Sequence, residues 1–328
     1  MKSSLFLGFL LLTAGLTSCD KKGPSPASSS PQPALSLGDQ SAAQSIASSA
    51  YKHTEKILSF GHRQPESVGL TRSKRYVIEQ LKQAGWISIE QKFTAKTPKG
   101  PMTFSNIIAR YSPDGNNTVW SRPPKAVIGA HIDSKILPNF LGADDAASCV
   151  ATNIALAQYF QTKHPEVARE LELVFFDGEE AVGENMVYGK DGLYGSMYYS
   201  RTVQKAVAQQ SVPYKQKPKF GIVLDMIGHK NLDIKIPADT PRRLKKSYDQ
   251  ARKKLKLEKH FSHSNGSFLD DHVPMNEIAR IPTIDLIGDF SSNKWWHTSG
   301  DNLDLISPKS LEMSIHLTLE ILADQISH

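Results

Sequence analysis

The 328-residue sequence contains only two cysteines, Cys19 and Cys149, so it could form at most one internal disulfide. It has no CxxC pair, no GxSxG nucleophile elbow, no HExxH motif and no Walker loop. These absences remove the usual signatures of thiol redox chemistry, α/β-hydrolase serine catalysis, HExxH metalloproteases and P-loop nucleotide hydrolysis. Only one long apolar run is present, "LFLGFLLLTAGL" near the N-terminus, and it is short for a membrane-spanning helix.

The N-terminal segment is predicted to lie outside the folded domain. Residues 1–18 combine a basic start with the apolar run, as secretory signal peptides do. The run ends in "LTSC", which resembles the lipobox of bacterial lipoproteins, so Cys19 is expected to be lipidated. Residues 19–42 are rich in Ser and Pro and are expected to form a flexible tether. We therefore expect an exported chain, anchored through Cys19 in the bacterial cell envelope on its periplasmic side, with its folded domain over residues 43–328.

Once Cys19 is assigned to lipidation, Cys149 has no partner for an intramolecular disulfide. It lies in the small-residue stretch "DDAASCVATNIALA", which is typical of a helix start. A buried packing thiol is favoured there over a nucleophile.

The net charge of +6 raises nucleic acid as a partner. The most basic stretch is "RRLKKSYDQARKKLKLEK" at 242–259, in which apolar residues recur at helical spacing and basic residues occupy the other side. This pattern predicts a solvated surface helix. Export argues further against nucleic acid, and we expect no nucleic-acid partner.

Strand-like and helix-like segments alternate over most of the chain. Residues 87–97 and 102–112 alternate in the strand manner and predict a hairpin around "PKGP". Mostly apolar strands separated by helices predict an α/β fold, a single domain with a central, mostly parallel mixed sheet flanked by helices on both faces. The predicted core strands lie within 125–133, 171–177, 220–228 and 281–290, and the predicted helices within 41–61, 71–86, 146–163 and 307–325.

Side chains that bind metals follow the predicted core strands. In such sheets, ligands bind at the carboxyl ends of the strands, so these side chains should gather at one edge. None of them is informative alone, because a single His or Asp at a strand end is usually an ordinary loop residue. The set has imidazoles and carboxylates but no cysteine: His131, Asp133, Asp144, Asp145, Asp177, Glu179, Glu180, Asp225, Asp270, Asp271, His272 and His297.

Crowded carboxylates repel one another and raise one another's pKa, so a divalent cation is the physical reason to gather them. Mixed imidazole and carboxylate ligands suit zinc with an open position for substrate. The adjacent pair Glu179 and Glu180 in "DGEEA" follows a buried strand, and neighbouring side chains there point in different directions. One glutamate can therefore bind metal while the other faces the substrate as a base.

The segments "HIDS", "GADDAAS", "DGEEA", "LDMIG" and "WHTSGDNLD", in this order, resemble the zinc aminopeptidase family M28. Within that family the chain is more similar to the glutaminyl cyclases. Three details favour the cyclases: "HIDSK" with Lys135, "DGLYGS" after the glutamate pair, and "DDHVPM" followed by "WWHT". The resemblance covers roughly residues 45–328, and it implies a zinc aminopeptidase-like fold.

The resemblance implies a role for each matching residue. Asp145, Glu180 and His297 would be the ligands of one zinc ion, and Glu179 would be the general acid/base. Asp270 would be a second catalytic side chain, hydrogen-bonded near the substrate amide. The other carried-over residues are Trp296 and Asp271 in the substrate pocket, and His131 and Asp225 as either hydrogen-bond partners of the site or ligands of a second metal.

The chain departs from the family pattern in two places. Many animal cyclases have a histidine in the strand before the final motif, where this chain has Asp285. The segment after the glutamate pair lacks the aromatic residue that often lines the pocket, and it offers Glu184, Asn185 and Tyr188 instead.

Two activities therefore remain open. A cyclase with one zinc ion would convert N-terminal glutamine of peptides or proteins to pyroglutamate and release ammonia. An aminopeptidase with two zinc ions would require His131 and Asp225 as ligands and would hydrolyse the first peptide bond. A non-catalytic envelope binding protein is disfavoured, because no ligand or base of the pattern is missing.

Overall fold

The computed structural model describes residues 35–291 and 294–328. The expected signal peptide, Cys19 and most of the expected tether lie outside the described residues. The first helix, α1 (Gln40–Leu58), begins where the Asp39 side chain accepts the backbone N–H of Ala42, slightly before the predicted domain start at residue 43. In the described part of the chain, no helix combines the length and apolar character needed to cross a bilayer.

The described strands form one mixed sheet in the order β1-β2-β4-β3-β5-β8-β6-β7. The neighbours β4, β3, β5 and β8 run parallel. The pairs β1–β2, β2–β4 and β6–β8 are antiparallel, and β7 runs parallel to β6 at the edge. The predicted mostly parallel mixed sheet is thus confirmed. The strands are β1 (Trp86–Thr97), β2 (Gly100–Tyr111), β3 (Ala126–His131), β4 (Leu171–Phe176), β5 (Phe220–Asp225), β6 (Ile234–Ile236), β7 (Phe261–His263) and β8 (Thr283–Gly288).

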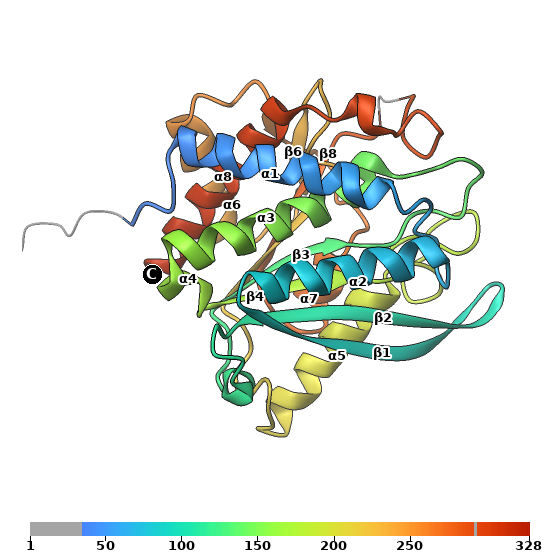
Figure 1. Ribbon diagram of the computed structural model, residues 1–328, viewed down its shortest axis with the longest axis horizontal. Helices are drawn as coiled ribbons and strands as arrows, with labels where there is room; N and C mark the ends of the chain where they lie inside the picture. The colour runs from blue at the N-terminus through green and yellow to red at the C-terminus, as the bar shows by residue number, and fades with distance from the viewer. Residues whose placement is uncertain (1–34, 292–293) are drawn as a thin grey trace, which may run out of the picture. The chain divides into compact units, whose positions relative to one another are not determined.

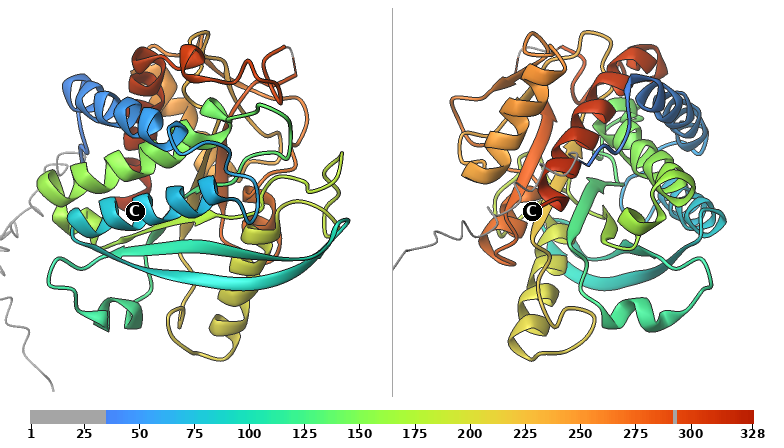
Figure 2. Two further views of the ribbon diagram at one scale, coloured as in Figure 1. Left: turned by 45° about the vertical axis from the view of Figure 1, so that its right-hand side comes forward. Right: turned by 90° about the vertical axis from the view of Figure 1, so that its left-hand side faces the viewer.

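Helices cover both faces of the sheet (Figures 1 and 2). Apolar side chains of α1, α2, α3, α6 and α8 pack on one face in the larger core cluster, and those of α5 and α7 pack on the other face. Because the central strands β3, β4, β5 and β8 are buried on both faces, they are almost continuously apolar. The other helices are α2 (Val68–Gln83), α3 (Ser148–Lys163), α4 (Pro165–Ala168), α5 (Tyr194–Ala208), α6 (Arg242–Lys254), α7 (His272–Glu277) and α8 (Pro308–Ile326).

Several local predictions are confirmed. The hairpin β1–β2 turns between Thr97 and Gly100, inside the predicted "PKGP". The helix predicted within 307–325 is α8, and Ser307 caps it by accepting the Ser310 backbone N–H. Cys149 is fully buried in α3 as a free thiol.

The short strands β6 and β7 and the helices α5 and α7 were not predicted. Three-residue strands such as β6 show no period, and α7 has six residues with Pro274 inside. The α5 sequence "YGSMYYSRTVQKAVA" mixes aromatic, β-branched and small residues that do not favour helix. Packing of its buried side against the sheet, in the cluster with Tyr199 and Val203, overrides that weak propensity.

Candidate metal and catalytic centre

The site residues gather at the carboxyl edge of the central strands, as predicted. His131 is the last residue of β3 and pairs with Phe176 at the end of β4, so "DGEEA" begins beside it. Asp225 is the last residue of β5 on the other side of β3. Parallel strands in register therefore deliver an imidazole from β3 and the acids that end or follow β4 and β5 to one edge.

Two glycines allow the ligand-bearing loops to adopt a left-handed backbone conformation in close contact with neighbouring atoms. Gly142 has φ +61°, and a Cβ there would lie 2.0 Å from the Asp145 backbone oxygen. Gly178 has φ +77°, and a Cβ there would lie 2.5 Å from the Phe104 ring. Any other residue would be strained at both positions, so "GADD" and "DGEE" owe their glycines to backbone geometry.

Asp145, Glu180 and His297 form one candidate metal group. His297 Nε2 lies 3.4 Å from Asp145 Oδ2 and 3.3 Å from Glu180 Oε1. The three residues come from the turn before α3, the loop after β4 and the loop after β8. These are the residues that the family resemblance predicts as ligands of a single zinc ion.

A second candidate group shares Asp145 with the first. His131 Nε2 lies 3.0 Å from Asp145 Oδ1 and 3.3 Å from Asp225 Oδ1, and all three side chains are buried. Asp145 thus turns one oxygen toward each group. A carboxylate placed in this way could bridge two metal ions. It could equally bind one metal ion through Oδ2 while its Oδ1 accepts a hydrogen bond from His131.

The donor atoms fit a cation because they converge without satisfying one another. Asp145 Oδ2, Glu180 Oε1, Asp225 Oδ1 and both ring nitrogens of His131 are buried and have no hydrogen-bond partner among the described residues. Buried polar atoms are rarely left unpaired, and each costs roughly 1–3 kcal/mol. An imidazole–carboxylate set with unused lone pairs suits zinc.

The pKa shifts express the same crowding. Burial lowers the pKa of His297, but Asp145 and Glu180 outweigh it and raise the value to about 9. The pKa of His131 is raised well above its usual value, because the carboxyls of Asp133, Asp145 and Asp225 outweigh burial. The carboxylates outnumber the imidazoles, so the site favours binding of a positive charge, either a proton on a histidine or a metal cation.

Glu179 differs from its neighbour Glu180 in position and charge. It belongs to neither candidate metal group, yet it lines the same cavity. Burial, reinforced by Glu180 and Asp270, raises the pKa of Glu179 well above its usual value, although His131 opposes the shift. A buried carboxyl that takes up a proton readily, beside a ligand, is placed for proton transfer.

Two buried aspartates hold the ligand-bearing loops: Asp133, which the sequence placed only in the set of possible metal-binding side chains, and Asp301, which it did not single out. Asp133 accepts the backbone N–H groups of Glu179 and Glu180 at 3.1 and 3.2 Å. Asp301 accepts those of Asp144 and Asp145 at 2.8 and 3.2 Å. Each carboxylate spans two consecutive amides and so fixes the backbone from which a predicted ligand projects.

Arg63 lies beneath this centre and was also missed. Its guanidinium is fully buried and donates to the backbone oxygens of Ile132, Leu141 and Gly142 at 3.0, 2.6 and 2.8 Å. In the described residues no carboxylate hydrogen-bonds to it, although Asp301 and other site acids act on it through space. In the sequence it stands in "FGHRQP", between two helices, with nothing that distinguishes it from a loop residue.

A cavity of about 340 Å³ opens onto the centre, within the range of small-ligand pockets. Trp296 stacks on His297 with ring centroids 3.8 Å apart, and Phe290 packs on Trp296 at 4.8 Å. Glu184 and Asn185 line the wall where the family pattern would have an aromatic residue, whereas Tyr188 does not. The lining residues are Lys135, Asp145, Glu179, Glu180, Glu184, Asn185, Met186, Asp225, Met226, Leu269, Asp270, Ile287, Phe290, Trp296 and His297.

The two aspartates of "LDDH" have different places. Asp270 lines the cavity, and burial together with Asp285 and Asp225 raises its pKa well above the usual value. Asp271, expected in the substrate pocket, is fully buried and does not line the cavity. It directly precedes α7 and faces Ser196 of α5, because adjacent residues at this turn point in different directions.

Asp285, which stands where animal cyclases have histidine, is fully buried on β8. Its Oδ2 lies 3.2 Å from His272 Nδ1, and it forms a candidate cluster with His272 and Asp270. An imidazole is therefore still present beside the Asp270 carboxyl, but it comes from α7 instead of β8.

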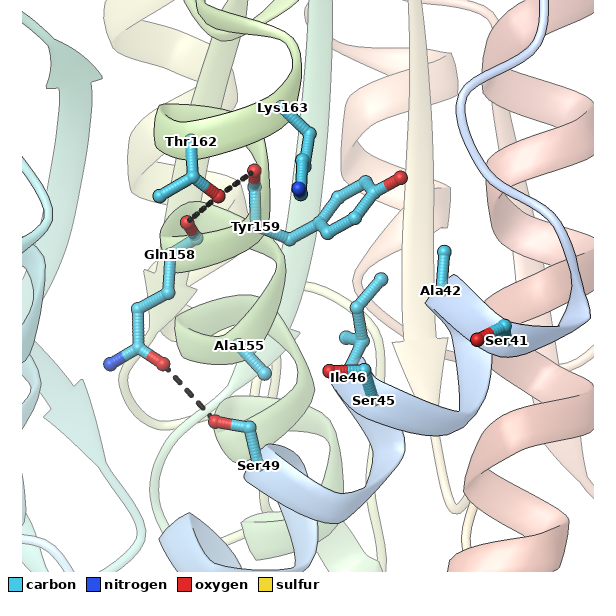
Figure 3. A pocket seen from close by; sticks show the side chains of 10 residues that line it. All are labelled: Ser41, Ala42, Ser45, Ile46, Ser49, Ala155, Gln158, Tyr159, Thr162 and Lys163. Carbon is cyan, nitrogen blue, oxygen red and sulfur yellow. Dashed lines mark hydrogen bonds between the residues drawn. The ribbon is translucent and has the colours of Figure 1, made fainter.

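A larger hollow of about 490 Å³ lies between α1 and α3, away from the predicted site residues (Figure 3). Its wall contains mainly serine, alanine and threonine, with Gln158 hydrogen-bonded to Ser49 at 3.1 Å. It has no histidine, cysteine or acid, so it offers no metal-ligand set.

Comparison with known proteins agrees with this geometry. The sequence pattern of peptidase family M28 matches residues 106–322, and the chain belongs to this family. A glutaminyl-peptide cyclotransferase from Dictyostelium discoideum is 28% identical over 294 residues, which cover 80% of each chain. The resemblance to the glutaminyl cyclases within M28 is thus confirmed.

Solved structures give the same fold. Porphyromonas gingivalis glutaminyl cyclase superposes with a TM-score of 0.71 at 27% identity, covering 85% of this chain and 98% of that chain. A Bacteroides thetaiotaomicron protein described as a leucine aminopeptidase precursor gives 0.72 at 26% identity, covering 85% and 97%. The names of these two neighbours, a glutaminyl cyclase and a leucine aminopeptidase precursor, correspond to the two activities that the sequence left open.

Proposed function

We propose that this chain is a glutaminyl-peptide cyclotransferase, which converts N-terminal glutamine of peptides or proteins to pyroglutamate and releases ammonia. The observation that carries the proposal is the division of labour between Glu179 and Glu180. Glu180 points into a ligand group with Asp145 and His297, whereas Glu179 faces the cavity as a buried carboxyl with a raised pKa. The named cyclase relatives favour this activity over peptide hydrolysis.

Asp145, Glu180 and His297 would hold one zinc ion, and their unpaired inward oxygens support this assignment. When bound, zinc would supply Lewis-acid polarisation of the substrate γ-carboxamide. Trp296 stacks on the His297 ring at 3.8 Å between centroids, and Phe140 meets the same ring edge-on at 5.7 Å. These contacts would keep the imidazole oriented toward the carboxylates.

Glu179 would carry the proton transfer. The α-amine of the substrate attacks its own γ-carbonyl carbon, the carbon–nitrogen bond of the side-chain amide breaks, and ammonia leaves. Glu179 would take the proton from the attacking amine and deliver it to the departing nitrogen, so no water is consumed. Burial suits this role, because it brings the carboxyl pKa closer to the range in which both forms are accessible.

The cavity would contribute by holding the glutamine side chain folded back on its own amine. Nucleophile and electrophile belong to one residue, so orientation supplies a large share of the rate. Trp296, Phe290, Ile287 and Leu269 give the pocket apolar walls. Asp270 lines the same pocket and would hydrogen-bond the substrate amide nitrogen.

A dinuclear zinc aminopeptidase is the second candidate, because the second ligand group is complete. His131, Asp145 and Asp225 are buried and converge within bonding reach of one cation. With two zinc ions, the chain would bind a peptide N-terminus and use Glu179 as the base for hydrolysis.

We also propose that the chain is exported and anchored through a lipid on Cys19 to the periplasmic side of a bacterial envelope membrane. The support is the signal-like start, the "LTSC" sequence and the Ser/Pro-rich segment that precedes the domain. Replacing Cys19 with Ser should move the chain from the membrane fraction to the soluble fraction of expressing cells. A wild-type chain already found in the soluble fraction would contradict the anchor.

The activity is tested with the chain beginning at residue 20, purified with zinc. One peptide starting with Gln and one starting with Leu are followed by mass spectrometry, together with the zinc content per chain. A cyclase removes one ammonia from the Gln peptide, leaves the Leu peptide intact and holds about one zinc ion. Removal of the entire first residue from the Leu peptide, with about two zinc ions bound, would establish the aminopeptidase instead.

A further inference from the structure

One short surface segment accounts for the positive charge of the whole chain. Residues 242–259 contain nine Lys and Arg but only two acids, a net charge of +7, whereas the complete chain carries +6. The remaining residues therefore carry a net charge of −1. The basic character is thus a local property of α6 and the turn that follows it.

Five of the nine cations of this segment are exposed and have no partner among the described residues. Arg242, Lys246 and Lys253 follow helical spacing along one side of α6, and all three are exposed. Lys256 and Lys259, in the turn after the helix, are exposed as well. We call five side chains the basic face; none has a hydrogen-bond or ion-pair partner among the described residues: Arg242, Lys246, Lys253, Lys256 and Lys259.

Two acids lie among these cations. The Asp249 carboxylate is already neutralised, because its Oδ1 lies 2.8 Å from both Arg252 Nε and His263 Nε2. Glu258 is exposed in the turn after α6. One unpaired anion against five unpaired cations leaves the surface strongly positive.

The basic face lies close to the point where the described chain begins. A Cβ on Gly38 would lie 3.1 Å from Leu319 of α8, and Lys254 at the end of α6 pairs with Glu320 at 2.7 Å. The two segments therefore meet α8 at consecutive residues, and Figure 2 shows α8 between α1 and α6. Only fifteen residues separate Cys19 from Leu35. A lipid on Cys19 would hold this side within at most about 55 Å of a bilayer.

The basic face starts at the end of the sheet opposite the catalytic edge. Lys125, just before β3, donates to the Ile326 carbonyl at the end of α8, so this end of α8 lies where the strands begin. The start of α6 contacts the same end, because Arg243 donates to the Gln325 carbonyl. The turn after α6 leads into the edge strand β7, which begins level with the end of β8. None of the five basic-face residues lines the cavity, so contact through this face covers no lining residue.

We propose that the basic face binds the anionic headgroups of phospholipids and rests on the membrane to which the chain is tethered. The location of the chain at a membrane rests on the proposed lipid anchor. The binding of anionic headgroups by the basic face does not depend on that anchor. Exposed lysines attract an anionic leaflet over roughly a Debye length, about 8 Å at physiological salt. An anchored chain samples that distance continually, so weak attraction suffices to hold the domain with its basic face on the membrane.

The test uses the chain beginning at residue 20, without lipid, at physiological salt. Co-sedimentation compares vesicles of phosphatidylcholine alone with vesicles containing one third phosphatidylglycerol. The triple variant Lys246→Gln, Lys253→Gln and Lys256→Gln should bind the anionic vesicles roughly 100-fold more weakly than wild type, because each lysine contributes a similar increment. The matched control removes the same charge elsewhere, at three exposed lysines: Lys52→Gln, Lys82→Gln and Lys92→Gln.

The proposal predicts that the control binds nearly as wild type does and that neutral vesicles bind none of the chains. Cyclase activity should be unchanged in both variants, which also shows that they are folded. Equal losses in both variants, or no binding of wild type to anionic vesicles, would overturn the proposal. Tighter binding of wild type to a mixed-sequence oligonucleotide at the same salt would overturn it in favour of nucleic acid. A chain that binds vesicles but lacks cyclase activity would contradict the proposed function alone.

Discussion

Replacement of Arg63 is expected to be the most damaging single change outside the predicted ligands. Its guanidinium makes three hydrogen bonds of 2.6 to 3.0 Å to backbone carbonyls of the loop that carries Asp145. Arg63→Met would take this donor from the Ile132 and Leu141 carbonyls, whereas the Gly142 carbonyl would keep the Ala147 backbone N–H. Charged hydrogen bonds contribute about 1.5–3 kcal/mol each, offset by the relief of desolvating the arginine. We expect a net loss of about 3–5 kcal/mol in the free energy of unfolding.

The assay is urea unfolding followed by far-ultraviolet circular dichroism, supported by thermal melts. A loss of this size lowers Tm by roughly 6–15 °C for a domain of this size. Arg63→Lys keeps the charge but can reach fewer carbonyls, so it should be intermediate. Arg72→Met, at an exposed arginine of α2, is the matched control and should unfold as wild type does. An Arg63→Met chain as stable as the control would refute the role assigned to the guanidinium.

The remaining predictions concern the metal group and one remote histidine. Glu179→Gln should retain zinc while activity falls by orders of magnitude, whereas Glu180→Gln should lose zinc. The measurement is the zinc content of each purified variant. Loss of zinc from Glu179→Gln and its retention in Glu180→Gln would mean that the two roles are exchanged. Zinc should raise the Tm of wild type but not of His297→Ala, and an unchanged zinc response would remove His297 from the ligands. Burial lowers the pKa of His53, which contacts Tyr76. The folded state therefore binds this proton less tightly, so stability is full above about pH 6.5 and falls as the pH drops through the lowered pKa. His53→Gln should flatten that acid-side loss in urea titrations at several pH values, and an unchanged slope would contradict it.

The sheet and its catalytic edge could be predicted because their signals are strong and local. A strand buried on both faces must be apolar, and polar residues that follow such strands share one edge. The second glutamate of "DGEEA" and the histidine of "WWHT" are therefore placed together by topology. The structure brings Glu180 and His297 to 3.3 Å from each other.

The supports of the site could not be predicted, because their signals are not periodic. Arg63, Asp133 and Asp301 act on backbone groups of distant segments, and a side chain that bonds to a backbone leaves no pattern in its partner's sequence. The placement of Asp271 depends on the exact rotation of the turn before α7, which the repeated acid in "LDDH" does not encode. Sequence reasoning therefore identified the groups that could do chemistry better than the groups that position them.

The central claim is that the substrate amine, and not water, attacks the glutamine side chain. The most direct test treats a peptide starting with Gln in heavy-oxygen water with the zinc-loaded chain and follows product mass. The account predicts loss of one ammonia with no heavy oxygen in the product, and no product when Glu179 is replaced by Gln. Incorporation of heavy oxygen, either in a deamidated peptide or at a newly released carboxylate, would contradict it.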